Sequence, residues 1–302
     1  MPDAAAELLT IRDFLRHAVS RFRAARLAHG HGASNALDEA AFLILENLHL
    51  PVDDINPWLD ARLTEAERVN LADLIRTRIE TRKPAAYLVH RTYIHGVSFY
   101  VDERVIVPRS YIGELMFSGL FGGEGFNLVE RPEQVSAVLD LCTGSGCLAI
   151  LAAGIFPNAE IDAADLSEPA LEVARINLRE HDLDSRINLL QGDLWETVEG
   201  QTYDLIITNP PYVAMAEVAA FPREYVHEPV VAHVGGEDGL DIVRRILEGA
   251  ADHLKPGGGL VCEIGTGRDI LVAEYPHLDF LWLDTEESQG EVFWLSREQL
   301  VA

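Results

Sequence analysis

Cysteine is scarce in this chain of 302 residues, which has only Cys142, Cys147 and Cys262 and no C-x-x-C pair. An odd number without paired spacing argues against a disulfide framework and a zinc site, so no metal is expected. A reducing, cytoplasmic setting fits this composition. The apolar run over residues 147–156 is about half as long as a membrane span needs to be. The opening residues carry acids and no basic cluster, so a secretory signal is not expected either.

Basic residues are also few. The chain has 24 Lys and Arg against 49 Asp and Glu, which gives a formal net charge of −25. Duplex binding depends on Lys and Arg that neutralise phosphates, so direct binding to duplex DNA is not expected. A basic protein, by contrast, would be attracted over a long range by a field of this sign. The acidity is equally compatible with a simple role in solubility.

The first 90 residues have the apolar spacing of helices, and residues 92–108 alternate as in a β-hairpin. Thr64 and Glu67 form a capping-box pattern at the start of one helix, which must end before Pro84. Helices are predicted over residues 5–28, 37–48 and 64–81. We therefore expect a helical domain over 1–90, a β-hairpin linker over 91–110 and a larger domain over 111–302. The helical domain is expected to dock a substrate; the alternative is that it only stabilises the fold.

From about residue 136 onward, apolar strands alternate with helical segments. Strands are predicted over 138–142, 160–166, 187–191, 203–208 and 259–265, and helices over 147–155, 168–181 and 240–254. Two more strands, joined by a turn at Gly290, end the chain without a helix between them. Buried strands interleaved with helices predict an α/β fold with a doubly wound sheet. The final hairpin predicts one antiparallel strand inserted late in that sheet.

A glycine loop from Asp140 to Gly146 follows the first of these strands and opens the next helix. Glycines let the backbone approach a ligand, and a helix start offers free N–H groups. Asp165 ends the second strand, about 20 residues after the loop, where an acid can bind ribose hydroxyls. Asp140 would suit a cationic amine better than a pyrophosphate, and Asp193 ends the third strand, within reach of an adenine amino group. The three acids predict a nucleoside that carries an amino-acid cation, although the loop alone also fits a nicotinamide dinucleotide.

The fourth strand ends in Asn209-Pro210-Pro211-Tyr212. Two prolines fix φ and remove two N–H donors, so the carbonyls of Asn209 and Pro210 remain as outward acceptors. A planar –NH2 group has two N–H donors, which the Asn209 side-chain oxygen and the Pro210 carbonyl can accept together. Positive charge on that nitrogen is then favoured in the transition state. Tyr212 would pack on the amide face, and the turn predicts methylation of an amide nitrogen without a histidine or carboxylate base.

These motifs, in this order, resemble those of the class I amino-methyltransferases, and within them the protein-(glutamine-N5) methyltransferases of the HemK/Prm group. The resemblance covers nearly the whole chain and includes Pro108-Arg109, His227-Glu228-Pro229 and the glycines of segment 235–239. It implies a class I methyltransferase-type doubly wound seven-stranded sheet with the last strand antiparallel. It also implies S-adenosyl-L-methionine as cofactor and S-adenosyl-L-homocysteine as product. The site residues it implies are Asp140, Thr143, Gly144, Gly146, Asp165, Asp193 and Asn209 for the cofactor; Asn209, Pro210 and Tyr212 for catalysis; and Asn209, Pro210, Pro211, Tyr212 and Glu228 for the substrate.

Two branches of this group have to be separated. Cys142 stands where the release-factor branch usually has glycine, and Pro-Arg-Ser at 108–110 and the ending over 292–300 are more similar to the PrmB branch. That branch acts on large-subunit ribosomal protein three, so a glutamine of that basic protein is the expected acceptor. Tyr111 departs from the pattern, which has a proline or another small residue there. Methylation of release factors is the alternative, followed by a DNA amino-methyltransferase, a NAD-dependent dehydrogenase and a non-catalytic module.

Overall fold

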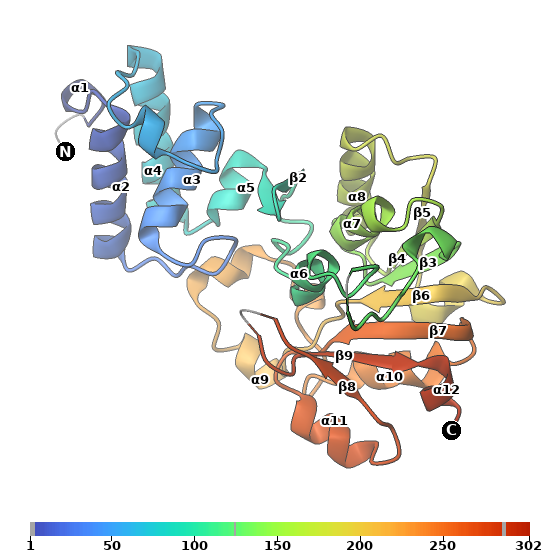
Figure 1. Ribbon diagram of the computed structural model, residues 1–302. Helices are drawn as coiled ribbons and strands as arrows, with labels where there is room; N and C mark the ends of the chain where they lie inside the picture. The colour runs from blue at the N-terminus through green and yellow to red at the C-terminus, as the bar shows by residue number, and fades with distance from the viewer. Residues whose placement is uncertain (1–3, 124, 286–287) are drawn as a thin grey trace.

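A helical lobe is joined to a larger α/β lobe in the computed structural model of the chain (Figure 1). The structure describes residues 4–123, 125–285 and 288–302. The two lobes meet through residues near the β-hairpin and through a segment that follows the fourth strand of the main sheet. None of the helices in the described ranges is long and apolar enough to cross a membrane.

The helical lobe contains the predicted helices, with ends set by side-chain caps. The helix expected over 5–28 is interrupted, because Thr10 and Asp13 form a capping box that starts a new helix. Asn35 caps the next helix, and the predicted Thr64–Glu67 capping box is present. The α-helices that the structure describes in this lobe are α1 (Ala4–Glu7), α2 (Ile11–Ala25), α3 (Ala36–Asn47), α4 (Glu65–Thr81) and α5 (Ala85–Val89).

The β-hairpin that follows is antiparallel, as expected, but shorter than residues 92–108. Its strands are β1 (Thr92–Ile94) and β2 (Val97–Phe99). Beyond it the chain is irregular, because Val101, Val105 and Val107 turn inward and are buried. The segment leads into α6 (Tyr111–Phe117), a helix that the sequence analysis did not predict and that the Ser110 side chain caps.

The main sheet has seven strands in the order β5-β4-β3-β6-β7-β9-β8. The first five strands in this order pair in parallel with their neighbours. Strand β9 lies between β7 and β8 and is antiparallel to both. This confirms the doubly wound sheet and the late antiparallel strand. The strands are β3 (Ala137–Leu141), β4 (Glu160–Asp165), β5 (Ile187–Gln191), β6 (Tyr203–Thr208), β7 (Leu254–Glu263), β8 (Leu281–Leu283) and β9 (Val292–Ser296).

Helices cover both faces of this sheet (Figure 1). One apolar core joins the sheet to α6 and α7, and a second joins it to α10. The helix expected over 240–254 ends at residue 250, because residue 254 already pairs with Tyr203 at the start of β7. The Lys-Pro-Gly-Gly segment therefore lies within an irregular strand. The helices are α7 (Cys147–Ile155), α8 (Glu168–Glu180), α10 (Asp241–Ala250), α11 (Arg268–Glu274) and α12 (Arg297–Leu300).

Candidate active site

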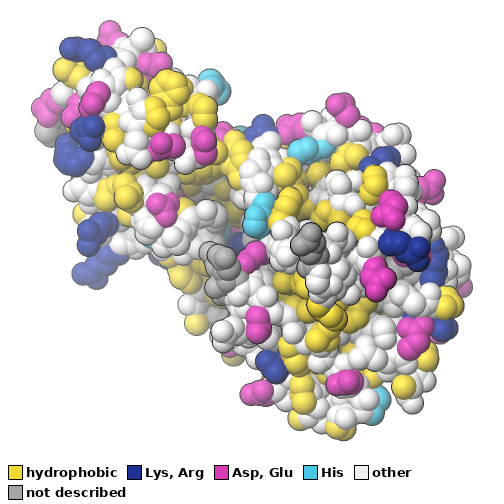
Figure 2. All heavy atoms as spheres, viewed as in Figure 1, with side chains coloured by type: hydrophobic (Ala, Val, Ile, Leu, Met, Phe, Trp, Pro, Cys, Tyr) yellow, Lys and Arg dark blue, Asp and Glu magenta, His cyan; other side chains and the backbone are white. Residues whose placement is uncertain are grey.

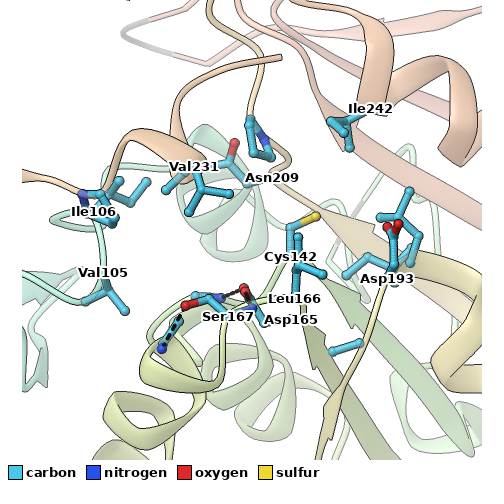
Figure 3. A pocket seen from close by; sticks show the side chains of 18 of the residues that line it. Val105, Ile106, Cys142, Asp165, Leu166, Ser167, Asp193, Asn209, Val231 and Ile242 are labelled. Atoms are coloured by element: carbon cyan, nitrogen blue, oxygen red, sulfur yellow. Dashed lines mark hydrogen bonds between the residues drawn. The ribbon is translucent and has the colours of Figure 1, made fainter. Parts of the chain in front are cut away.

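A cavity of about 180 Å³, here called the first cavity, opens at the carboxyl ends of the central strands. This is where open α/β sheets bind ligands. Asn209 lies on one side of it and Asp165 with Ser167 on the other, with Cys142 between them (Figure 3). The predicted site residues that line it are Gly144, Asp165, Asp193, Asn209 and Pro211.

Asp165 is the acid most closely tied to the glycine loop. Its Oδ2 accepts a hydrogen bond from the Gly144 backbone N–H at 2.8 Å, and its Oδ1 accepts one from Ser167 N–H at 2.8 Å. Burial raises the pKa of its carboxyl group. Each carboxylate oxygen still has a second lone pair, so the group can accept hydroxyl donors from a ligand while it holds the loop.

Asp140 lies beneath the glycine loop and does not line the first cavity. It is completely buried, and its Oδ2 accepts hydrogen bonds from Thr143 Oγ at 2.6 Å and from Ala149 N–H at 3.0 Å. Its Oδ1 is buried without a hydrogen-bond partner among the described residues. Burial raises the pKa of this carboxyl to about 7. Asp140 and Thr143 thus shape the loop from below, and Gly146 starts α7 with φ +79°.

Asp193 lines the first cavity from a more exposed position. Its side chain is 40% exposed and forms an ion pair with Arg245 at 2.9 Å. The pair leaves acceptor capacity on a carboxylate at the edge of the cavity. Apolar residues also line this part of the cavity, among them Leu194 and Ile242, and apolar side chains suit an aromatic base.

The Asn-Pro-Pro-Tyr turn is divided between cavity and core. Asn209 and Pro211 line the first cavity, whereas Pro210 is buried. The Tyr212 hydroxyl points away and donates a hydrogen bond to Glu263 Oε1 at 2.8 Å. Burial raises the pKa of this phenol well above its usual value, so it stays protonated as a donor. Tyr212 therefore anchors the turn, and the expectation that it packs on the acceptor amide remains a prediction.

Two glycines explain why a Gly-Gly-x-Asp-Gly motif accompanies this turn. A Cβ on Gly235 would lie 2.6 Å from the Pro211 carbonyl oxygen, and one on Gly239 would lie 2.3 Å from the Tyr212 carbonyl oxygen. Gly239 also has φ +87°, in the left-handed region. The backbone of residues 235–239 thus packs directly behind the backbone of the turn and fixes where its carbonyls lie.

We expect Gly235→Ala to displace the Pro211 carbonyl and to lower kcat by up to about 10²-fold, because misplacement of about 1 Å can have that effect. Steady-state kinetics with saturating cofactor would measure it. Gly154→Ala is the matched control, since a Cβ there meets nothing within 4 Å. Equal rates for the two variants would contradict the supporting role of the motif.

Glu228 is enclosed by its own hydrogen-bond partners. It was expected to bind the substrate, but its side chain has no exposed surface, and its two oxygens accept hydrogen bonds from the Arg109 guanidinium at 2.8 and 2.9 Å. Oε1 also accepts from Val107 N–H at 2.9 Å, and His233 Nε2 lies 3.0 Å from Oε2. These donors lower the pKa of Glu228 far below its usual range. A carboxylate this fully engaged positions its neighbours, so its expected part in substrate binding, which remains a prediction, would act through them.

Residues 223–234, here called the cover segment, carry Glu228 and form part of the first cavity's wall. Pro229 and Val231 line that cavity. The helical lobe holds the other end of the segment, because Glu224 accepts hydrogen bonds from Arg82 at 3.1 Å and from Ala28 N–H at 3.2 Å. Burial of charged groups on this scale needs such partners. The helical lobe therefore helps to set the position of a wall of the first cavity.

Glu263 is a buried residue behind the site that was not predicted from the sequence. It ends β7 and is completely buried. Besides the Tyr212 hydroxyl, it accepts hydrogen bonds through Oε2 from Ser110 Oγ at 2.7 Å and from Tyr111 N–H at 2.9 Å. An acid inside an otherwise apolar strand was the available signal, since buried carboxylates need several donors. Glu263 links the catalytic turn to the start of α6.

Burial raises the pKa of Glu263 to about 7. A folded-state pKa above the unfolded value means that stability is lost as pH rises between the two values, with a limiting slope of about 1.4 kcal/mol per pH unit. Glu263→Gln cannot ionise, so we expect the stability advantage of the wild type over this variant to shrink from pH 5 to pH 8. Urea unfolding at both pH values measures it. A difference that stays constant or grows with pH would refute the assignment.

Cys142 adopts φ +59° at the end of β3 and lines the first cavity. This left-handed conformation favours glycine, and a cysteine there is unusual. A cysteine thus stands where the backbone conformation favours glycine, and its side chain lines the first cavity.

Comparison with known proteins gives consistent results. A model of the methyltransferase small domain matches residues 127–228. The chain is 56% identical over 295 residues to the ribosomal protein uL3 glutamine methyltransferase of Bradyrhizobium diazoefficiens, covering 97% of this chain and 92% of the relative. It is 52% identical over 294 residues to the protein of that name from Bordetella pertussis, with 97% of each covered. A relative of the same name from Neisseria gonorrhoeae is 53% identical over 298 residues, covering 99% and 98%.

The fold is also similar to a solved structure. The hMettl16 catalytic domain, in complex with MAT2A 3'UTR hairpin 6, aligns with a TM-score of 0.51 at 14% identity. The alignment covers 76% of this chain and 80% of that one. At this identity the likeness concerns the class I methyltransferase fold alone.

Proposed function

Because the chain belongs to the family of ribosomal protein uL3 glutamine methyltransferases, we propose that it methylates the side-chain amide of one glutamine in ribosomal protein uL3. The observation that supports the reaction most directly is the place of Asn209. It lines the first cavity together with the acids Asp165 and Asp193, and it faces Asp165 from the other side of that cavity. A nicotinamide dehydrogenase would leave the proline turn unexplained.

The first cavity fits S-adenosyl-L-methionine by the chemistry of its lining. Asp165 would hold the ribose hydroxyls, and Asp193 with the apolar side chains around it would hold the adenine. Below the loop, the buried Oδ1 of Asp140 has no hydrogen-bond partner among the described residues. A cationic group of the ligand would favour the ionised form of this carboxyl, whose pKa is raised by burial. The bound cofactor supplies an electrophilic methyl group on a sulfonium.

The residues of the Asn-Pro-Pro-Tyr turn orient and activate the acceptor amide. An amide nitrogen is a weak nucleophile because its lone pair is delocalised into the carbonyl. The Asn209 side-chain oxygen and the Pro210 carbonyl accept hydrogen bonds from the two N–H groups of the amide. These bonds orient the nitrogen and stabilise the positive charge that develops on it. Tyr212, held by Glu263, keeps the turn in place. The methylated nitrogen is strongly acidic and loses its proton to water, so no general base is needed.

The identity of the acceptor rests on relatives of 51–56% identity that carry the uL3 name. The formal net charge of −25 agrees with a basic ribosomal protein as partner. Release factors, the alternative acceptor, remain a test of this assignment.

Methyl transfer from labelled S-adenosyl-L-methionine should be measured into purified uL3 and into class I release factors in parallel. We expect label in uL3. Label in release factors alone would keep the reaction and overturn the substrate. Label in neither protein would overturn the proposed function.

A further inference from the structure

A second cavity, of about 950 Å³, lies between the helical lobe, the β-hairpin and the α/β lobe. It is larger than the first cavity and more open, and it takes no part in the cofactor chemistry described above. Its described lining comes from four separate segments, which are the helical lobe, the β-hairpin, the region around α6 and the residues that follow β8.

The second cavity is connected to the catalytic turn through Glu263. Ser110 and Tyr111 line it, and both donate hydrogen bonds to Glu263, whose other oxygen holds the Tyr212 hydroxyl. Arg109 also lines it and is bonded to Glu228, the neighbour of a residue in the first cavity's wall. The second cavity is thus linked to the Asn-Pro-Pro-Tyr turn through the buried carboxylate of Glu263, and to the wall of the first cavity through that of Glu228.

Carboxylates outnumber Lys and Arg side chains in the described lining of the second cavity. Glu114 and Asp284 contribute two carboxylates. Arg109 is the single Lys or Arg among the described lining residues, and Glu228 neutralises it at 2.8 Å. On the face shown in Figure 2, acidic side chains are spread over both lobes, with Lys and Arg among them. A segment with positive charge is therefore attracted to this cavity and an acidic one is repelled.

The rim offers aromatic surface as well. Phe117 is 49% exposed, and its ring lies 4.6 Å from that of His95. Tyr93 and Tyr111 line the cavity beyond this pair. Aromatic faces beside carboxylates suit Arg and Lys side chains, which can stack on a ring while their charge is paired.

We propose that the second cavity docks a basic segment of the substrate protein next to its acceptor glutamine, and so selects the protein before the amide reaches the turn. This inference rests on the proposed function, because it takes uL3 as the occupant. It assigns Glu114, Asp284 and the Phe117–His95 pair to recognition of the flanking chain, whereas Asn209 and Pro210 recognise the amide itself.

Binding of purified uL3 to the full-length enzyme, measured by calorimetry at low salt, tests the charge. We expect Glu114→Gln/Asp284→Asn to weaken binding about fivefold to tenfold, since each exposed pair contributes up to about 1 kcal/mol. Glu199→Gln/Asp252→Asn is the matched control, because it removes the same charge from exposed sites near the opposite ends of the strands. Equal affinities for the two double variants, or no binding of uL3 by the wild type, would overturn the proposal.

Crosslinking tests the location independently of folding losses. A photoreactive side chain at Phe117 should crosslink to uL3, and the same group at Val301, which is 58% exposed, should not. Crosslinks from neither position, or equally from both, would overturn the docking site. If uL3 is methylated normally while these results are negative, the proposed function stands and the docking site fails. If uL3 binds in the second cavity but is never methylated, the proposed function fails.

Discussion

Replacing Asn209 by alanine should lower kcat by about 10²- to 10³-fold, the effect of removing one preorganised hydrogen bond to developing charge. The variant removes the acceptor for one amide N–H and leaves the two prolines, and thus the turn, in place. The cofactor acids Asp165 and Asp193 are untouched, so binding of S-adenosyl-L-methionine should stay nearly unchanged. Single-turnover kinetics with cofactor in excess would separate the methyl-transfer step from binding.

Asn188→Ala provides the control for that experiment. Asn188 is exposed and donates a hydrogen bond to Asp162 on the neighbouring strand, away from both cavities. It should keep the wild-type rate. An Asn209→Ala enzyme that also kept that rate would refute the role of the turn, and one that lost cofactor binding in proportion would reassign Asn209 to the cofactor alone.

Replacing Arg109 by alanine should cost about 3 kcal/mol of unfolding free energy, because removal of one partner leaves a buried charge without compensation. Glu228 has no exposed side-chain surface, and Arg109 supplies two of its hydrogen bonds. Val107 N–H and two histidines remain near the carboxylate, which limits the loss. Because Glu228 holds the cover segment, the variant should also bind cofactor more weakly.

Arg12→Ala is the comparison for this second experiment. Arg12 pairs with Asp60 at 2.9 Å, but the two side chains are 58% and 87% exposed. Exposed pairs contribute about 0–1 kcal/mol, so its unfolding free energy should hardly change. If urea unfolding gave the same small loss for both variants, the Arg109–Glu228 pair would not be the support that its geometry indicates.

Much of the fold could be predicted from local patterns. The alternation of apolar strands with helices was sufficient for the sheet and for its late antiparallel strand, because a hairpin without a helix cannot make a parallel crossover. The turn after β6 was recognisable because proline cannot donate a hydrogen bond to a sheet, so two prolines mark the end of a buried strand. The break at Thr10 was not predicted, because the apolar spacing continues across the capping box that Thr10 and Asp13 form.

The sequence predicted residues that line the first cavity better than residues that act through others. Gly144, Asp165, Asp193 and Asn209 follow strand ends, so the topology brings them together around one cavity. Glu228 and Glu263 take their roles from partners that are distant in sequence, such as Arg109 and Ser110. Those pairings form only when the lobes and the sheet are assembled, and no spacing along the chain indicates them.

One measurement tests the central claim most directly. Purified uL3 would be incubated with S-adenosyl-L-methionine and either the wild-type enzyme or Asn209→Ala, then digested and sequenced by tandem mass spectrometry. We expect a single methyl group on the side-chain amide of one glutamine with the wild type, and almost none with the variant. A methyl group on lysine, arginine or the backbone, or equal methylation by both enzymes, would contradict the account.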